Sequence, residues 1–251
     1  ETFFGTTVHD PYRWLEDVKS PETMSWMIAT SERSHAALAA LPGRQTLLDA
    51  LEKYDSSVSA RVFGVVRETG DRWFYERRGA TENQFKLLMR QGTAGRERVL
   101  VDPEAIEKRT GKPHAINYFG VSPGGTHVAY GLSAQGSEAA VLHVLDTRSG
   151  RSLGRPITRT DYGSPSFSAD GRHLLFSRLQ ALAPGLPATE KYQRSQTFLM
   201  RLGGDAEKAR RIFGLGVPGV DITPAEIPIA AFTHDGRWII GYVYNGTQRE
   251  I

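Results

Sequence analysis

Apolar side chains in the first part of the chain recur at spacings of three and four residues, which is the period of an α-helix. Ser20-Pro21-Glu22 is a helix-start signal, because it offers a capping hydroxyl, a proline in the first turn and an acid near the positive end of the helix dipole. Leu41-Pro42-Gly43 breaks this helix, and a second helix is predicted over Arg44–Tyr54. The pattern therefore predicts an N-terminal helical segment over residues 1–55.

From Arg61 onward the pattern is that of strands and turns. Short runs rich in Val, Phe, Tyr, Leu and Ile are bounded by Gly, Pro, Asp and Ser. The first four runs follow one another with no helix between them, so we expect them to pair as an antiparallel meander. These runs are Arg61–Glu68, Arg72–Arg77, Phe85–Gln91 and Arg98–Val101.

A turn motif then recurs along the chain, each time between a short apolar strand and a longer one. Its copies are Ser122-Pro123-Gly124-Gly125, Ser168-Ala169-Asp170-Gly171 and Thr233-His234-Asp235-Gly236. Asp-Gly favours a tight hairpin turn, because both residues tolerate positive φ. The last glycines of successive motifs are 46 and 65 residues apart. The longer interval contains the Pro/Gly-rich stretch Ala181–Lys191, which we interpret as a loop insertion.

A repeat of roughly 40–50 residues with four strands per unit is typical of a β-propeller blade, and a two-sheet sandwich is the alternative. The predicted fold is mainly β: a partial β-propeller of about three and a half four-stranded antiparallel blades over residues 56–251, preceded by the α-helical segment. The predicted blades cover about 61–102, 115–160, 161–215 and, incompletely, 229–251. Because a propeller closes radially, we expect this chain to be part of a longer protein.

Composition narrows the classes of partner. The 251 residues are 39% hydrophobic and 24% charged with a net charge of +3, as in a globular protein with dispersed cations, so no nucleic-acid partner is predicted. No run approaches the ~20 apolar residues of a membrane-spanning helix, and no membrane partner is predicted. The absence of cysteine excludes disulfides and thiolate chemistry but does not fix the compartment, for which the cytoplasm is favoured and the periplasm is the alternative.

Two motifs resemble sites but sit in the wrong context. Gly120–Gly124 matches the G-x-S-x-G nucleophile elbow, yet a strand follows instead of a helix and Pro123 lacks the N–H that an oxyanion hole needs. Gly214–Gly219 matches a dinucleotide-binding pattern without a helix to receive the phosphates. The histidines are scattered and show no metal-ligand spacing. The chain is therefore predicted to hold no catalytic residue, no cofactor and no metal.

The segment Asp10-Pro11-Tyr12-Arg13-Trp14-Leu15-Glu16-Asp17 resembles the DPYRWLED opening of enzymes of the prolyl oligopeptidase family. A Ser-Pro-Glu…Trp helix follows it. Residues 121–138, with Ser122-Pro123-Gly124-Gly125, Ala129-Tyr130 and Gly136-Ser137-Glu138, look like a blade of that family, and Phe167–Gly171 resembles the start of the next blade. One departure is Gly124, where the family usually has Asp; glycine supplies the same backbone freedom.

The resemblance implies a seven-bladed propeller that caps an α/β-hydrolase domain with a Ser–Asp–His triad. Such enzymes cleave short peptides, commonly after proline, and the propeller is thought to exclude large folded substrates. The implied partners are these peptides and the C-terminal hydrolase domain of the same chain, so the segment alone is expected to be inactive. The family tends to place an aromatic residue near the substrate pocket at the position of Tyr162, for which packing is the alternative role.

A second hypothesis is a non-enzymatic β-propeller binding module that uses its central channel or its loops as a platform. The DPYRWLED segment and its helices have no obvious purpose in a free-standing propeller, which favours the peptidase.

Overall fold

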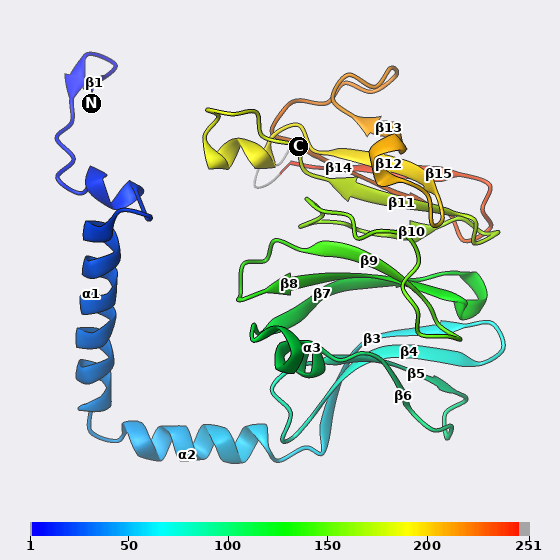
Figure 1. Cartoon of the computed structure of the whole chain (residues 1–251), viewed down its shortest axis with the longest axis horizontal. Helices are drawn as coiled ribbons and strands as arrows, with labels where there is room; N and C mark the ends of the chain where they lie inside the picture. Colours follow the sequence, from blue (N-terminus) through cyan, green and yellow to red (C-terminus); the bar gives the residue numbers. More distant parts are fainter. Residues whose placement is uncertain (1, 246–251) are drawn as a thin grey trace, which may run out of the picture. The chain divides into compact units, whose positions relative to one another are not determined.

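The computed structural model describes residues 2–245, which fall into two compact units divided between Val58 and Ser59. The first unit holds a short antiparallel hairpin, a 3-10 turn and both predicted helices (Figure 1). Their bounds are Thr2–Phe3 (β1), Thr6–Thr7 (β2), Arg13–Glu16 (η1), Pro21–Ala39 (α1) and Arg44–Asp55 (α2).

The start of α1 is fixed by the residues that the sequence indicated. Ser20 Oγ accepts a hydrogen bond from the Thr23 backbone N–H at 3.1 Å, which satisfies one of the free donors of the first turn. The buried hydroxyl of Thr23 in turn donates to the carbonyl oxygen of Trp14 at 3.0 Å. The rings of Trp14 and Trp26 meet edge to face with centroids 6.0 Å apart. These contacts hold the 3-10 turn against the first turns of α1.

The second unit consists of antiparallel sheets, each built from strands that follow one another in the chain. The first sheet contains Ala60–Glu68 (β3), Arg72–Gly79 (β4), Lys86–Gln91 (β5) and Arg98–Val101 (β6); the second contains His114–Val121 (β7), His127–Ala134 (β8) and Val141–Asp146 (β9). The third contains Ser166–Phe167 (β10), His173–Arg178 (β11), Gln196–Arg201 (β12) and Arg210–Gly214 (β13), and the last pairs Ile227–Phe232 (β14) with Ile239–Tyr244 (β15). Short 3-10 turns are η2 (Pro123–Gly125), η3 (Ala188–Tyr192) and η4 (Ala206–Lys208).

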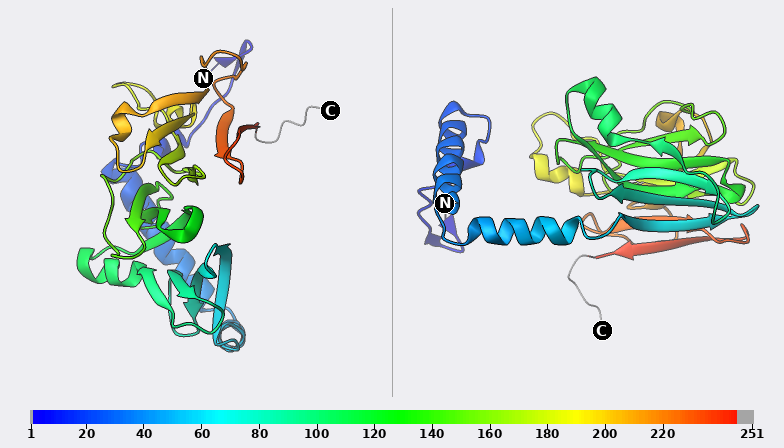
Figure 2. Two further views of the ribbon diagram at one scale, coloured as in Figure 1. Left: turned by 90° about the vertical axis from the view of Figure 1, so that its right-hand side faces the viewer. Right: turned by 90° about the horizontal axis from the view of Figure 1, so that it is seen from below.

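The sheets stack on one another in chain order, and in the left view of Figure 2 they follow an arc from the cyan strands to the red ones. Apolar side chains fill the spaces between them. Phe74, Leu87 and Val101 of the first sheet pack with residues of β8 and β9. Leu174 and Phe176 of the third sheet pack with residues of the second. The structure is thus mainly β with antiparallel sheets and few helices, as predicted.

No closed ring of sheets is present among residues 2–245, so the number of blades stays a prediction. Residues 246–251 of the last predicted blade lie outside the described residues.

The second sheet differs from the predicted four strands, because its outer position is filled by an irregular segment. Two isolated bridges, Leu142 to Ile157 and Leu145 to Ser152, replace a fourth strand. Leu153 N–H still donates to the Val144 carbonyl oxygen at 2.8 Å. Pro156 has no N–H to donate, which interrupts a continuous ladder.

A helix that the sequence analysis missed, Pro103–Thr110 (α3), connects the first two sheets. Asp102 caps it, accepting hydrogen bonds from the N–H groups of Glu104 at 3.0 Å and Ala105 at 3.1 Å. Asp102-Pro103-Glu104 repeats the Ser-Pro-Glu signal that marked α1. The helix was overlooked because eight residues are too few to show an apolar period.

The recurring turn motif makes the same side-chain hydrogen bond in all three copies. The first hydroxyl accepts a hydrogen bond from the N–H five residues later: Ser122 from His127 at 2.9 Å, Ser168 from His173 at 2.9 Å and Thr233 from Trp238 at 3.1 Å. Gly124 replaces the aspartate of the other copies, and its N–H donates to Glu68 of the first sheet at 2.9 Å. This hydrogen bond therefore links the turn at Gly124, which lacks the aspartate, to strand β3 of the first sheet.

Candidate functional site

A hollow of about 540 Å³ surrounds Tyr162 at the end of the sheets where β7 and β14 begin. Its walls come from three sheets: β7, the segment that leads into β10, and the β14–β15 hairpin. We call it the Tyr162 cavity, and it is lined by Asn117, Tyr118, Asp161, Tyr162, Ser164, Ile227, Ile229 and Tyr244. Because these residues are far apart in the sequence, the stacking of the sheets creates the cavity.

Tyr118 fixes the back of the Tyr162 cavity. Its hydroxyl donates a hydrogen bond to the carbonyl oxygen of Thr160 at 2.6 Å. Burial raises the pKa of Tyr118 to about 12, so the phenol keeps its proton at neutral pH. A Cβ on Gly163 would lie 2.5 Å from Cζ of this ring, so only glycine lets the backbone after Tyr162 approach so closely. The position of Tyr162 is therefore set by the Tyr118 ring.

Tyr162 itself is 48% exposed and is available to a ligand. The isoleucines of β14 and the tyrosine rings give the cavity an apolar wall, and Asn117, Asp161 and Ser164 supply hydrogen-bonding groups. Apolar walls with a few polar groups are typical of ligand-binding pockets. The carboxylate of Asp161 lies 3.3 Å from Lys191 Nζ and is therefore already paired.

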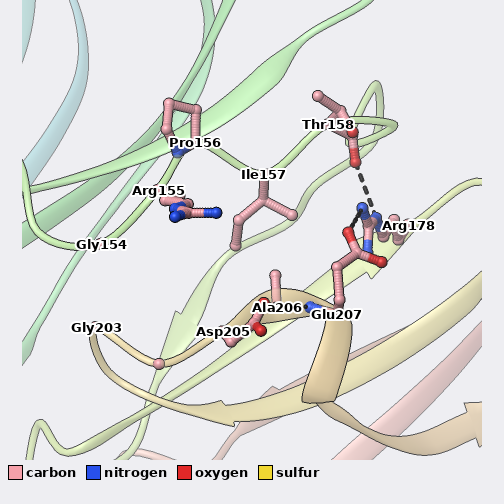
Figure 3. Close-up of a pocket in the computed structure, with 11 residues that line it drawn as sticks. Gly154, Arg155, Pro156, Ile157, Thr158, Arg178, Gly203, Asp205, Ala206 and Glu207 are labelled. Carbon is pink, nitrogen blue, oxygen red and sulfur yellow. Dashed lines mark hydrogen bonds and ion pairs between the residues drawn. The ribbon is translucent and has the colours of Figure 1, made fainter.

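A second hollow of about 520 Å³ lies between the second and third sheets (Figure 3). The side chain of Arg178, 6% exposed, donates to Glu207 Oε1 at 2.6 Å and to the Thr158 carbonyl oxygen at 3.0 Å. The hydrogen bond from Arg178 to Glu207 lowers the pKa of the Glu207 carboxyl group. Burial lowers the pKa of the neighbouring Arg159. Figure 3 shows Arg178 and Glu207 pointing toward one another. Arg178 of the third sheet thus pairs with Glu207 in the β12–β13 connection and joins this sheet to the outer segment of the second through Thr158, as a structural contact does.

The two motifs that resemble a nucleophile elbow and a dinucleotide-binding loop lie in turns, as the sequence predicts. Ser122 is fully buried in the turn between β7 and β8, with its hydroxyl accepting from His127 N–H. Gly214–Gly219 leaves β13 as turns with no helix. Within residues 2–245, no group of three or more His, Asp or Glu side chains could hold a metal ion. In the same range, no helix is long and apolar enough to cross a membrane.

Sequence reasoning singled out Tyr162 but not the residues around it. Tyr118, Asp161 and the isoleucines of β14 carry no local motif, and neither does Lys191 in the loop between β11 and β12. One signal was present: Gly163 follows Tyr162, and a glycine without a turn requirement often marks a close backbone approach.

Comparison with known proteins gives a match along the whole chain. Residues 1–251 match the family described as prolyl oligopeptidase, N-terminal beta-propeller domain. The prolyl endopeptidase of Elizabethkingia meningoseptica is 24% identical over 249 residues, which cover 98% of this chain and 33% of that protein. The prolyl endopeptidase of Elizabethkingia miricola is 23% identical over 248 residues, with the same coverage of both chains. This chain spans about a third of the length of these relatives.

Solved structures agree with this match. One of two prolyl endopeptidases studied for inter-domain dynamics in catalysis and specificity superposes with a TM-score of 0.80 at 29% identity, over 95% of this chain and 34% of that one. Prolyl oligopeptidase B from Galerina marginata, bound to a 35mer hydrolysis and macrocyclization substrate, gives a TM-score of 0.74 at 18% identity, over 94% of this chain and 34% of that one. The second likeness supports the fold alone.

Proposed function

The chain belongs to the prolyl oligopeptidase family, and on this premise we propose that it is the N-terminal and propeller portion of a serine-type peptidase that hydrolyses short peptides. The match of the family's propeller domain over residues 1–251 carries this proposal. The coverage of only about a third of the related endopeptidases fits a larger protein. In this proposal an α/β-hydrolase domain in the same polypeptide supplies the Ser–Asp–His triad.

The proposed role of this portion is to control access to the hydrolase domain. A ring of stacked sheets around a narrow channel admits a flexible peptide but not a folded protein. We propose that the blades follow the boundaries expected from the sequence, about 61–102, 115–160, 161–215 and from 229 onward, after the helical segment 1–55. The repeated turn hydrogen bonds of Ser122, Ser168 and Thr233 support this division.

Tyr162 is proposed to face the substrate. Its half-exposed ring lies in a hollow with apolar walls and hydrogen-bonding groups, as expected for a residue that contacts a peptide. The ring is also positioned by its neighbours, because Gly163 packs against Tyr118. In this role Tyr162 binds and orients the peptide and takes no part in bond cleavage.

The proposal is tested with the full-length protein and with residues 1–251. Both are incubated with a fluorogenic peptide that carries proline before the scissile bond. We expect turnover by the full-length protein that a serine-directed phosphonylating reagent abolishes, and no turnover by residues 1–251. Short peptides should be cleaved and a folded protein with exposed prolines should not.

Failure of the full-length protein to cleave any proline peptide would contradict the proposal and favour a binding module. Cleavage of the folded protein would contradict only the proposed role of the propeller in controlling access, and the proposed peptidase activity would stand.

A further inference from the structure

Asp161 is the charged group of the Tyr162 cavity. The other residues that line the cavity carry no carboxylate, ammonium or guanidinium group; three are tyrosines and two are isoleucines. The Asp161 side chain is only 11% exposed, so an unpaired carboxylate at this position would impose a strong local field. Lys191 Nζ lies 3.3 Å from Asp161 Oδ2 and cancels that field.

Lys191 reaches Asp161 from the loop between β11 and β12, where the sequence carries its insertion. This loop is anchored by hydrogen bonds on both sides of the lysine. Gln180 donates to the carbonyl oxygen of Glu190, and the Arg194 N–H donates to that of Pro224 at 2.6 Å. Lys191 Nζ also lies 4.6 Å from the centroid of the Tyr192 ring. The lysine is therefore held in place beside the cavity.

The charge of Lys191 is secure at neutral pH. A hydrogen bond with the Tyr192 side chain, and then one with Asp161, raise its pKa above the ordinary value. The other ion pair of the loop, Glu190 with Arg194, has its nearest atoms 3.9 Å apart and is more exposed. Neither Glu190 nor Arg194 lines the Tyr162 cavity.

We propose that the Asp161–Lys191 ion pair sets the charge selectivity of the Tyr162 cavity, which therefore accepts uncharged peptide segments in preference to charged ones. A charged substrate side chain that enters must give up water and finds both protein charges already paired. An uncharged segment has no such desolvation cost and gains the apolar wall. The proposal rests on the proposed function, since it concerns peptides that the full-length protein would cleave.

Loss of Lys191 and loss of Asp161 should change the charge preference of the cavity in opposite directions. Without Lys191 the carboxylate of Asp161 is free to attract a cationic side chain. Without Asp161 the ammonium group of Lys191 is free to attract an anionic one. Removing both charges should restore the preference for neutral segments.

The test measures kcat/KM of the full-length protein for three peptides that differ at one position upstream of proline, where they carry Lys, Gln or Glu. We expect K191Q to raise the Lys/Gln ratio, and D161N to raise the Glu/Gln ratio, by roughly three- to tenfold each. The double variant D161N/K191Q should return both ratios to those of the unsubstituted protein. Each ratio compares two peptides on one protein sample, so a loss of folded protein cancels. Added salt should weaken both effects.

Arg194→Gln is the matched control, because it removes a cation from the same loop without exposing a cavity charge. Its ratios should equal those of the unsubstituted protein. Unchanged ratios in K191Q and D161N, or a Lys/Gln ratio that rises in both variants, would overturn the assignment of the pair while the proposed function stands. Absence of any hydrolysis of the Gln peptide by the unsubstituted protein would overturn both.

Discussion

The ring of Tyr118 occupies the space that a side chain at Gly163 would need. The same ring lies against Gly131, its neighbour in the β7–β8 register, where an added Cβ would lie 2.5 Å from Cε1. The backbone of β8 and the segment that leads into β10 therefore both approach the ring directly. Since the hydroxyl of Tyr118 also donates to Thr160, this contact positions the chain on both sides of Asp161 and Tyr162.

Gly163→Ala should destabilise the protein, because the new methyl group overlaps the partly buried Tyr118 ring. We expect a loss of about 1–3 kcal/mol in the free energy of unfolding, as for other overpacked sites, measured by urea denaturation. In a Tyr118→Leu background the same substitution should cost less, because the overlapping ring is gone. An equal loss in both backgrounds would contradict the packing described here.

Tyr162→Ala should weaken peptide binding by the full-length protein. The ring is half exposed, so its removal should change the unfolding temperature little. We expect KM for a proline peptide to rise by roughly tenfold, the worth of one aromatic contact, with a smaller change in kcat. Tyr162→Phe keeps the ring and should retain KM within about twofold. A similar rise in KM for both variants would mean that the hydroxyl, not the ring, matters.

Ser122→Ala should cost stability but not activity. The buried hydroxyl accepts a hydrogen bond from His127 N–H, and its loss should lower the free energy of unfolding by about 1 kcal/mol. Ser168→Ala removes the equivalent bond to His173 and serves as the matched variant. Peptide hydrolysis by the full-length protein should be unchanged in both. Loss of hydrolysis in a normally folded Ser122→Ala protein would revive the nucleophile-elbow interpretation.

Glu76 of β4 should make stability depend on pH. Burial raises its pKa to about 7, above the unfolded value near 4.5. The folded state thus holds its proton more tightly, so stability falls as pH rises from about 4.5 to 7 and levels off above. Glu76→Gln should be more stable than the unsubstituted protein at pH 8, on the order of 1–3 kcal/mol, and the gain should shrink at pH 5. Thermal unfolding of both proteins at pH 5 and pH 8 measures this difference in stability.

Glu82 provides the control of opposite sign. A hydrogen bond from Lys86, and then one from the Gly79 N–H, lower the pKa of Glu82, so its contribution to stability is present above its unfolded pKa and is lost in acid. Glu82→Gln should therefore destabilise the protein at both pH 5 and pH 8. A gain in stability at pH 8 for both variants would indicate a general charge effect instead of the burial of Glu76.

The sequence indicated the local structure well where one short signal is enough. Ser20-Pro21-Glu22 marked the start of α1 because a cap, a proline and an acid act within one turn. The Ser168 and Thr233 turns were recognisable because their hydrogen bonds join residues only five apart. Asp102-Pro103-Glu104 is the same kind of signal for α3, but this helix is too short to show a helical period of apolar residues.

The cavity could not be derived in this way, because its residues meet only when the sheets stack. Tyr162 was proposed only from the family resemblance, and no local pattern predicted that Tyr118 would lie against Gly163 from a different sheet. Lys191 reaches Asp161 across 30 residues of sequence, and no spacing rule predicts such a contact. By itself the sequence determined the two N-terminal helices, most of the strands and the recurring turns, since these depend on neighbours in the chain. Tertiary structure decided which side chains surround Tyr162 and which charges cancel there, since packing between distant strands sets those distances.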